Sequence, residues 1–233
     1  MSKLQSTAVK ARRKAGESLQ LFPTAPWATR AVIEQELLPR GWARADMTVW
    51  DPCCGKGHMA LPLAEYFERV FATDIYDWGF GDRRDLDFTF ASAEDAPWPV
   101  DWVFANPPFT LAEDFLFKAL SIARIGVAMF VRLQWQEGGD RFHSVWDWDG
   151  PNRPHIVCPF AERVACIEEV WDPEASSATS YMWCVWMKDG STRPFWPLRH
   201  IRPGAARRYS RLSDLALASP GEAARRKRER EAT

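Results

Sequence analysis

The sequence predicts an α/β domain in which a mostly parallel sheet is covered by helices on both faces. Short apolar runs of β type alternate with segments of helical periodicity through the first half of the chain. Two of these runs, 47–51 and 70–74, end in an aspartate, at the end of a parallel strand where ligands bind. Because 233 residues suffice for one well-filled core, we expect one domain with extensions.

The first elements are expected between residues 28 and 74. A helix over 28–38 follows a Pro-Trp start signal. Strands are expected over 47–51 and 70–74, joined by an amphipathic helix over about 58–69. The inward-facing residues of this second helix are expected to be Met59, Leu63 and Tyr66 or Phe67.

The alternation continues with a strand over 102–105, a helix over 111–123 and a buried strand over 126–131. Strands separated by helices of this length favour parallel pairing. After Pro154 the pattern changes to short β-type runs with little helix between them, so we expect an antiparallel hairpin at the end of the sheet. These later runs are 156–158, 163–167 and 181–187, with a polar loop over 173–180.

The composition is that of a folded protein. Hydrophobic residues make up 46% and charged residues 26%, which excludes wholesale disorder, and core packing explains most of the 13 tryptophans. The five cysteines show no zinc-ligand spacing, so we expect reduced thiols and no metal site. No leader-like segment and no long uncharged apolar run is present, so we expect no membrane span and a cytoplasmic location.

The net charge of −1 conceals basic ends on an acidic body. Residues 1–17 hold five basic residues against one acidic residue, and 199–233 hold ten against four. This asymmetry favours a polyanionic partner, although 225–230 alone could be a solvated helical tail. We expect a flexible basic segment over 1–18, a catalytic domain over 19–211 and a basic tail over 212–233.

A glycine-containing loop, Asp51-Pro52-Cys53-Cys54-Gly55-Lys56-Gly57, comes directly after a strand and before a helix. Such a loop brings backbone close to a ligand, and an acid about 20 residues further on can bind ribose hydroxyls; Asp74 lies 23 residues beyond Asp51. The alternative is an ordinary tight turn. The missing third glycine argues against a nicotinamide site, and His58 after Gly57 argues against a phosphate loop.

A second motif, Asn106-Pro107-Pro108-Phe109, stands at the end of the strand expected over 102–105. By itself it could be a proline-rich loop that ends a strand. Its place after the glycine-containing loop favours a functional site instead.

Together the two segments resemble motifs I and IV of the S-adenosylmethionine-dependent methyltransferases that act on amino nitrogens. The resemblance implies a Rossmann-like class I methyltransferase fold with a mostly parallel seven-stranded sheet. The motif order is similar to the gamma arrangement, and the segments 131–138 and 181–186 are similar to strands of small phage-associated DNA adenine methyltransferases. The resemblance to this family covers roughly residues 19–211.

The motif IV tetrapeptide has a specific chemical purpose in that family. The lone pair of an aromatic amine is delocalised and attacks a methyl sulfonium poorly. Hydrogen bonds from the amino group to the Asn106 side-chain oxygen and the Pro107 carbonyl would turn this lone pair toward the methyl group. Pro108 stiffens the turn, and Phe109 would stack on a flipped base.

The resemblance also implies the cofactor contacts. The segment 22–27 looks like motif X, which folds over the methionine end of the cofactor, and Asp87-Phe88 looks like the pair that meets its adenine, with Glu94 or Asp95 as alternatives for the acid. The implied S-adenosylmethionine-binding residues are Thr24, Pro26, Trp27, Asp51, Pro52, Cys53, Gly55, Gly57, Asp74, Ile75, Asp87 and Phe88.

The expected reaction is methylation of N6 of adenine in DNA, with low or short sequence specificity because little chain remains for a recognition domain. The alternatives are RNA adenine N6, guanine N2, cytosine N4, a glutamine substrate or an inactive nucleic-acid-binding fold. Cys53 as a nucleophile is disfavoured by its place in the cofactor loop. The candidate phosphate contacts are Arg199, Arg202, Arg207, Arg208 and Arg211.

Overall fold

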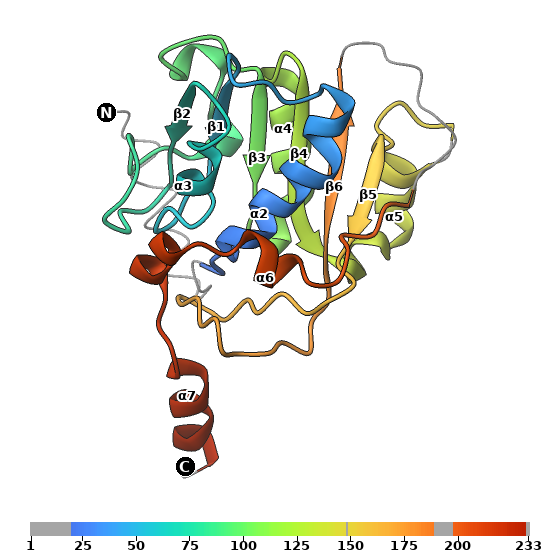
Figure 1. Cartoon of the computed structure of the whole chain (residues 1–233). Coiled ribbons are helices and arrows are strands. Elements are labelled where there is room, and N and C mark those ends of the chain that lie inside the picture. Colours follow the sequence, from blue (N-terminus) through green and yellow to red (C-terminus); the bar gives the residue numbers. More distant parts are fainter. Residues whose placement is uncertain (1–19, 148, 189–197, 232–233) are drawn as a thin grey trace.

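The computed structural model describes residues 20–147, 149–188 and 198–231. Their core is a six-stranded sheet in the order β2-β1-β3-β4-β6-β5 (Figure 1). The first four strands in this order are parallel, and β6 is antiparallel to both of its neighbours. The strands are β1 (Thr48–Asp51), β2 (Arg69–Ala72), β3 (Trp102–Ala105), β4 (Gly126–Arg132), β5 (Ile156–Pro159) and β6 (Tyr181–Met187).

Helices cover both faces of the sheet, as expected. One core joins α2 (Pro26–Val32), α3 (Ala60–Leu63) and α6 (Ala205–Tyr209) to alternate strand residues such as Phe104. The other joins α4 (Ala112–Ile122) to the intervening residues such as Val103. The remaining helical segments are η1 (Ile33–Leu37), η2 (Leu38–Arg40), η3 (Phe88–Phe90), η4 (Ala93–Asp95), η5 (Phe109–Leu111), η6 (Leu133–Gln136), α5 (Gly139–Arg141), η7 (Phe142–Trp146), η8 (Leu212–Leu217) and α7 (Glu222–Glu231).

The described sheet has six strands, so the expectation of seven is corrected. Between β2 and β3 the described chain forms turns and the short segments η3 and η4 and adds no strand to the sheet. The run over 163–167 is not a strand either; its last residue makes an isolated bridge to Val170. Residues 198–201 instead line the β5 edge through parallel bridges at Leu198 and Ile201.

The helix expected over 58–69 is much shorter than predicted. Only α3 is regular, and Pro62 within it has no N–H to donate to the preceding turn. Met59, Leu63 and Phe67 nevertheless lie in the core, as their spacing predicts.

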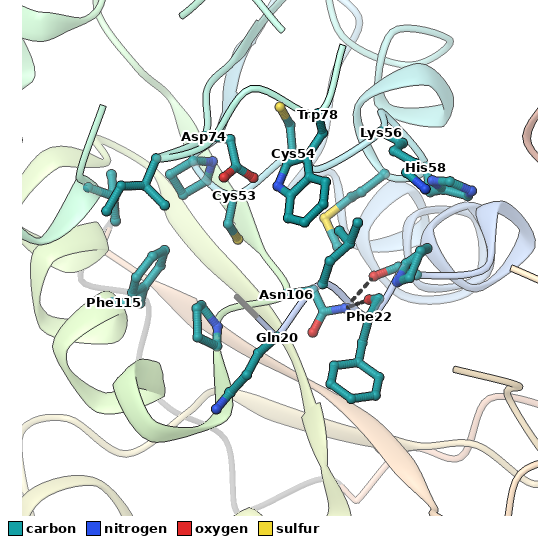
Figure 2. A pocket seen from close by; sticks show the side chains of 18 of the residues that line it. Gln20, Phe22, Cys53, Cys54, Lys56, His58, Asp74, Trp78, Asn106 and Phe115 are labelled. Carbon is teal, nitrogen blue, oxygen red and sulfur yellow. Dashed lines mark hydrogen bonds between the residues drawn. The ribbon is translucent and has the colours of Figure 1, made fainter. Parts of the chain in front are cut away.

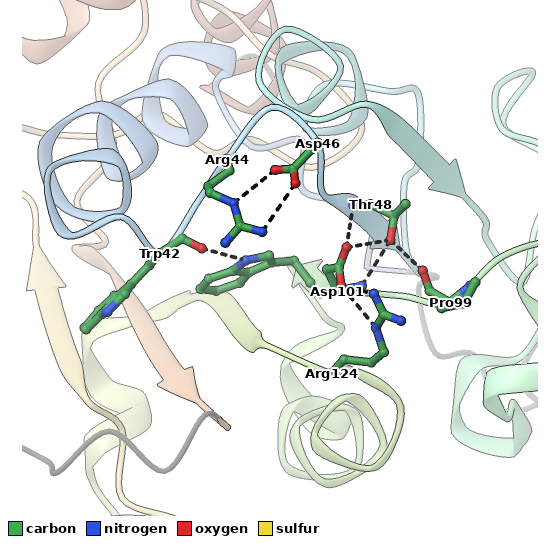
Figure 3. Close-up of polar contacts among 8 residues, drawn as sticks. Trp42, Arg44, Asp46, Thr48, Pro99, Asp101 and Arg124 are labelled. Carbon is green, nitrogen blue, oxygen red and sulfur yellow. Dashed lines mark hydrogen bonds and ion pairs between the residues drawn. The ribbon is translucent and has the colours of Figure 1, made fainter.

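The two edges of the sheet differ in their roles. The carboxyl ends of β1, β2 and β3 meet at the edge where a pocket lies (Figure 2). At the opposite edge Asp101 accepts hydrogen bonds from the Thr48 backbone N–H at 3.0 Å and from the Arg124 guanidinium at 2.6 Å (Figure 3). This carboxylate ties the starts of β1 and β3 to the segment that follows α4.

Replacing Asp101 with alanine is expected to lower the free energy of unfolding by about 1–3 kcal/mol, because a nearly buried acceptor of charged and backbone donors is lost. Urea unfolding measures the effect. The matched control is Arg124→Ala, whose side chain is 58% exposed and which should cost less. Equal losses in the two variants would show that the Thr48 contact contributes nothing.

The C-terminal segment begins in contact with the body. Asp214, in η8, is buried and accepts two hydrogen bonds of 2.7 Å from the Arg30 guanidinium. Beyond it, α7 stands out from the body on the side where β4 ends (Figure 1). The division of the chain at residue 211 stays a prediction, and the segment 1–18 lies outside the described residues.

Two further observations concern the described residues. None of their helices has the length and apolar character needed to cross a membrane. All five cysteines have free thiols, and no three metal-ligating side chains gather at one point in this part of the chain.

Candidate active site

The pocket is built from the loops that follow β1, β2 and β3, together with the N-terminal segment 20–24 (Figure 2). Nine of the predicted site residues line it. They are Thr24, Pro52, Cys53, Asp74, Ile75, Asp87, Phe88, Asn106 and Pro108.

Seven of the predicted cofactor or catalytic residues lie outside the pocket lining. They are Pro26, Trp27, Asp51, Gly55, Gly57, Pro107 and Phe109. Pro26 and Trp27 begin α2 and pack in the core.

The two loop glycines allow close packing beneath the pocket. Gly55 has φ 53° and Gly57 has φ 87°, which is backbone that favours glycine. A Cβ on Gly55 would stand 2.5 Å from the Leu21 side chain, and one on Gly57 2.8 Å from the Phe80 ring. The backbone N–H of Gly55 donates to the Asp74 carboxylate at 2.9 Å, so the loop is tied to the end of β2.

Two buried acids under this loop have different charges at neutral pH. Burial raises the pKa of Asp51 to about 8, and its Oδ2 has no hydrogen-bond partner among the described residues. Burial also raises the pKa of Asp74, but only to about 6, because backbone N–H groups such as those of Gly55 and Tyr76 stabilise its carboxylate. At pH 7 Asp74 is therefore mainly ionised, whereas Asp51 mainly keeps its proton.

The pH dependence of stability should report on Asp51. The folded protein keeps this proton up to a pH of about 8, while the unfolded chain loses it near 3.8. The stabilisation is therefore complete below pH 3.8 and is lost as the pH rises toward 8. Asp51→Asn should show a smaller fall in unfolding free energy than the wild type between pH 5 and pH 8, measured in urea. Parallel curves for the two proteins would contradict the assignment.

Asp87 and Phe88 lie together in the pocket wall. Asp87 Oδ1 accepts hydrogen bonds from the Thr89 N–H at 3.0 Å and the Thr89 hydroxyl at 2.6 Å. The Phe88 ring packs against Phe115 with centroids 5.1 Å apart. The alternative acids are outside the pocket lining: Glu94 is exposed, and Asp95 pairs with Arg83.

The Asn106 amide has a defined orientation. Its Nδ2 donates to the Phe22 carbonyl at 2.7 Å and to the Thr24 hydroxyl at 2.9 Å (Figure 2). Both amide hydrogens are thus engaged by the N-terminal segment. The Oδ1 atom is left as the part of the amide that can accept a hydrogen bond from a ligand.

Phe109 lies beside the pocket under a cation. The Arg132 guanidinium stands 3.4 Å from the ring centroid, and the Phe22 ring lies 5.0 Å away. The Phe109 N–H donates to the Gln20 side chain at 2.8 Å. A base can stack on the face covered by Arg132 only after this guanidinium moves.

None of the five predicted phosphate-binding arginines lines the pocket. They lie along the side of α2 and α6, where Arg199 pairs with Glu36 at 3.5 Å and Arg211 pairs with Glu65 at 2.9 Å. Arg208 lies over the Tyr209 ring, the Arg202 N–H donates to Gln35, and Arg207 is in α6. Two of these charges are therefore partly neutralised by glutamates.

Sequence reasoning missed several lining residues. Other lining residues fall in segments that the sequence had assigned to the site: Phe22 and Pro23 belong to the segment 22–27, and Cys54 and Lys56 belong to the glycine-containing loop, with His58 directly after it. The missed residues come from segments with no recognised site pattern and are Gln20, Leu21, Met59, Trp78, Leu86 and Phe115.

No protein-family model and no curated protein sequence matches the chain. Solved structures do match the chain. A Listeria monocytogenes protein assigned as a class I S-adenosylmethionine-dependent methyltransferase superposes with a TM-score of 0.53 at 10% identity, over 87% of this chain and 74% of that one. The chain has the fold of a class I methyltransferase.

Two other similar structures have TM-scores below one half. The first is a modification subunit assigned to a type I restriction enzyme of Vibrio vulnificus, with a TM-score of 0.49 and 12% identity over 92% of this chain. This chain spans 56% of that subunit. The second is assigned as an RNA methyltransferase of Pyrococcus horikoshii, with a TM-score of 0.48 and 13% identity, over 69% of this chain and 83% of that one.

Proposed function

We propose that this protein transfers a methyl group from S-adenosylmethionine to an exocyclic amino nitrogen, N6 of adenine in DNA. The observation that carries the proposal is the Asn106 amide at the end of β3, whose two hydrogens are held by Phe22 and Thr24. Pro107 follows Asn106 in the predicted tetrapeptide, and its carbonyl is proposed as the second acceptor. A pair of neighbouring acceptors would suit a donor with two hydrogens, which is an amino group.

The pocket fits the proposed cofactor. The ionised Asp74 at the end of β2 suits ribose hydroxyls, and Asp87 with Phe88 suits an adenine amino group and ring face. The turn over 52–57 brings backbone close to the pocket. When bound, S-adenosylmethionine supplies an electrophilic methyl group.

The protein's own part in the reaction is orientation. Asn106 Oδ1 and the Pro107 carbonyl accept hydrogen bonds from the substrate amino group, which localises its lone pair for attack. The proton left on the methylated nitrogen goes to water, because neither an amide nor a peptide carbonyl is a base at neutral pH.

The nucleic-acid partner is proposed from Arg132 beside the pocket and from exposed arginines elsewhere on the surface. Arg132 lies against Phe109, and α7 carries Arg228 and Arg230 exposed on the side where β4 ends. Arginines near a flipped base can hold the distorted phosphate backbone. The five arginines on the side of α2 and α6 are proposed as outer phosphate contacts. We also propose that residues 19–211 form the catalytic domain and that the basic segments on either side of it contact the nucleic acid.

The test is incubation of the protein with labelled S-adenosylmethionine and duplex DNA, single-stranded DNA, ribosomal RNA or protein, followed by mass detection of modified nucleosides. We expect N6-methyladenine in DNA at short or loosely defined sites. N4-methylcytosine, N2-methylguanine or methylated RNA would replace the adenine assignment. No transfer to any substrate would overturn the proposed activity.

A further inference from the structure

His58 is a buried titratable group that the proposed chemistry leaves unused. It lies just before α3, is 4% exposed and lines the pocket. Its Nε2 is 3.0 Å from the Leu217 carbonyl oxygen. Since a carbonyl can only accept, Nε2 carries the hydrogen and Nδ1 carries a lone pair. This Nδ1 is buried and has no hydrogen-bond partner among the described residues.

The tautomer is held by the C-terminal segment. Leu217 ends η8, and the next residues pair with Trp171 through a bridge at Ala218 and a 2.8 Å hydrogen bond from the Ser219 N–H. The Trp171 ring in turn lies edge-on to the imidazole, with centroids 6.3 Å apart. His58 therefore has a fixed orientation rather than a free ring.

The acidic and the basic side chains of the pocket lie at different ends. Asp74 lies toward the end that holds Phe115, whereas Lys56 and His58 lie together at the opposite end (Figure 2). Lys56 is the one permanently cationic side chain among the described lining residues, and its Nζ donates to the Glu169 carbonyl at 2.9 Å. One end thus suits a nucleoside, and the other offers a cation beside a neutral acceptor.

We infer that His58 and Lys56 form the subsite for the amino-acid end of the cofactor, with His58 Nδ1 accepting a hydrogen bond from the α-ammonium group and Lys56 facing the carboxylate. This inference rests on the proposed function and names residues for one part of the ligand. Burial lowers the pKa of His58 to about 4, so the ring is neutral at pH 7 and does not repel an ammonium group.

Calorimetry on the full chain with two ligands tests the subsite. S-adenosylhomocysteine has the amino-acid end, and 5′-methylthioadenosine lacks it. His58→Phe should weaken S-adenosylhomocysteine about 10- to 100-fold, since a hydrogen bond to a charged group is lost, and should leave 5′-methylthioadenosine within about twofold. His58→Asn, whose amide oxygen can reach the place of Nδ1, should recover part of the affinity.

An NMR measurement on the wild-type protein tests the same subsite without a substitution that could disturb folding. With ¹⁵N-labelled histidine, the Nδ1 resonance of His58 should move upfield on addition of S-adenosylhomocysteine and stay unchanged with 5′-methylthioadenosine. Equal weakening of both ligands in His58→Phe, or an unmoved resonance, would overturn the subsite while leaving the cofactor assignment intact. If the wild type bound neither ligand, the proposed function would fail, and the subsite with it.

Discussion

Asn106→Ala is expected to lower the rate of methyl transfer by about 10²–10³-fold, the loss typical of removing one preorganised hydrogen-bonding group from a transition state. The variant lacks the acceptor that localises the lone pair of the amino group. Affinity for S-adenosylhomocysteine should change much less, because the predicted cofactor contacts are on other residues. Single-turnover rates and calorimetry measure the two effects separately.

Thr24→Val is the matched control for that experiment. It removes one of the two partners of Asn106 Nδ2, yet keeps the side-chain volume and the Oδ1 acceptor. Its rate should fall less than tenfold, in line with one neutral hydrogen bond. A rate for Asn106→Ala within tenfold of the wild type would remove Asn106 from the mechanism.

Asp214→Ala should cost about 3–5 kcal/mol of stability, because it leaves part of the charge of Arg30 buried without its closest partner. Arg30 is 2% exposed and donates two hydrogen bonds to Asp214, two to Glu65 and one to the Tyr209 carbonyl. Glu65 remains in the variant but is 23% exposed, so it compensates only in part. Urea unfolding at pH 7 measures the loss.

Arg211→Ala is the control for Asp214→Ala. Arg211 also pairs with Glu65, at 2.9 Å, but its side chain is 50% exposed, so its loss should cost less than about 1 kcal/mol. Truncation after residue 211 should destabilise the protein as Asp214→Ala does. If Asp214→Ala were no less stable than Arg211→Ala, the buried pair would carry no net stability and the predicted boundary at 211 would gain support.

The parts of the fold that follow from local pattern agree with the sequence predictions. The strands at 102–105 and 181–187 appear as predicted because their apolar runs are buried on both sides of the sheet. The predicted strand over 163–167 was wrong, since a short β-type run needs a partner edge, and residues 198–201 take the place beside β5. Competition between segments far apart in the sequence cannot be recognised from the sequence of either segment alone.

Some residues of the candidate site could likewise be predicted from the sequence, and others could not. Asp74 and Asn106 were predictable because each lies within two residues of the end of a strand, and parallel strands bring their carboxyl ends to one edge. The cover of Phe109 by Arg132 was not, because it joins the end of one strand to the loop after another. The neutral charge and the fixed orientation of His58 were not predictable either, because they depend on burial and on the distant Leu217 carbonyl.

The sequence by itself determined the strand-and-turn units of this protein, because hydrophobic period, prolines and glycines act within a few residues. Tertiary structure decided how those units are oriented for chemistry. The Asn106 amide is turned by Phe22, 84 residues away, and Arg30 is paired by Asp214 across 184 residues. Such contacts depend on packing the whole chain around one sheet, so they appear only when the core has formed.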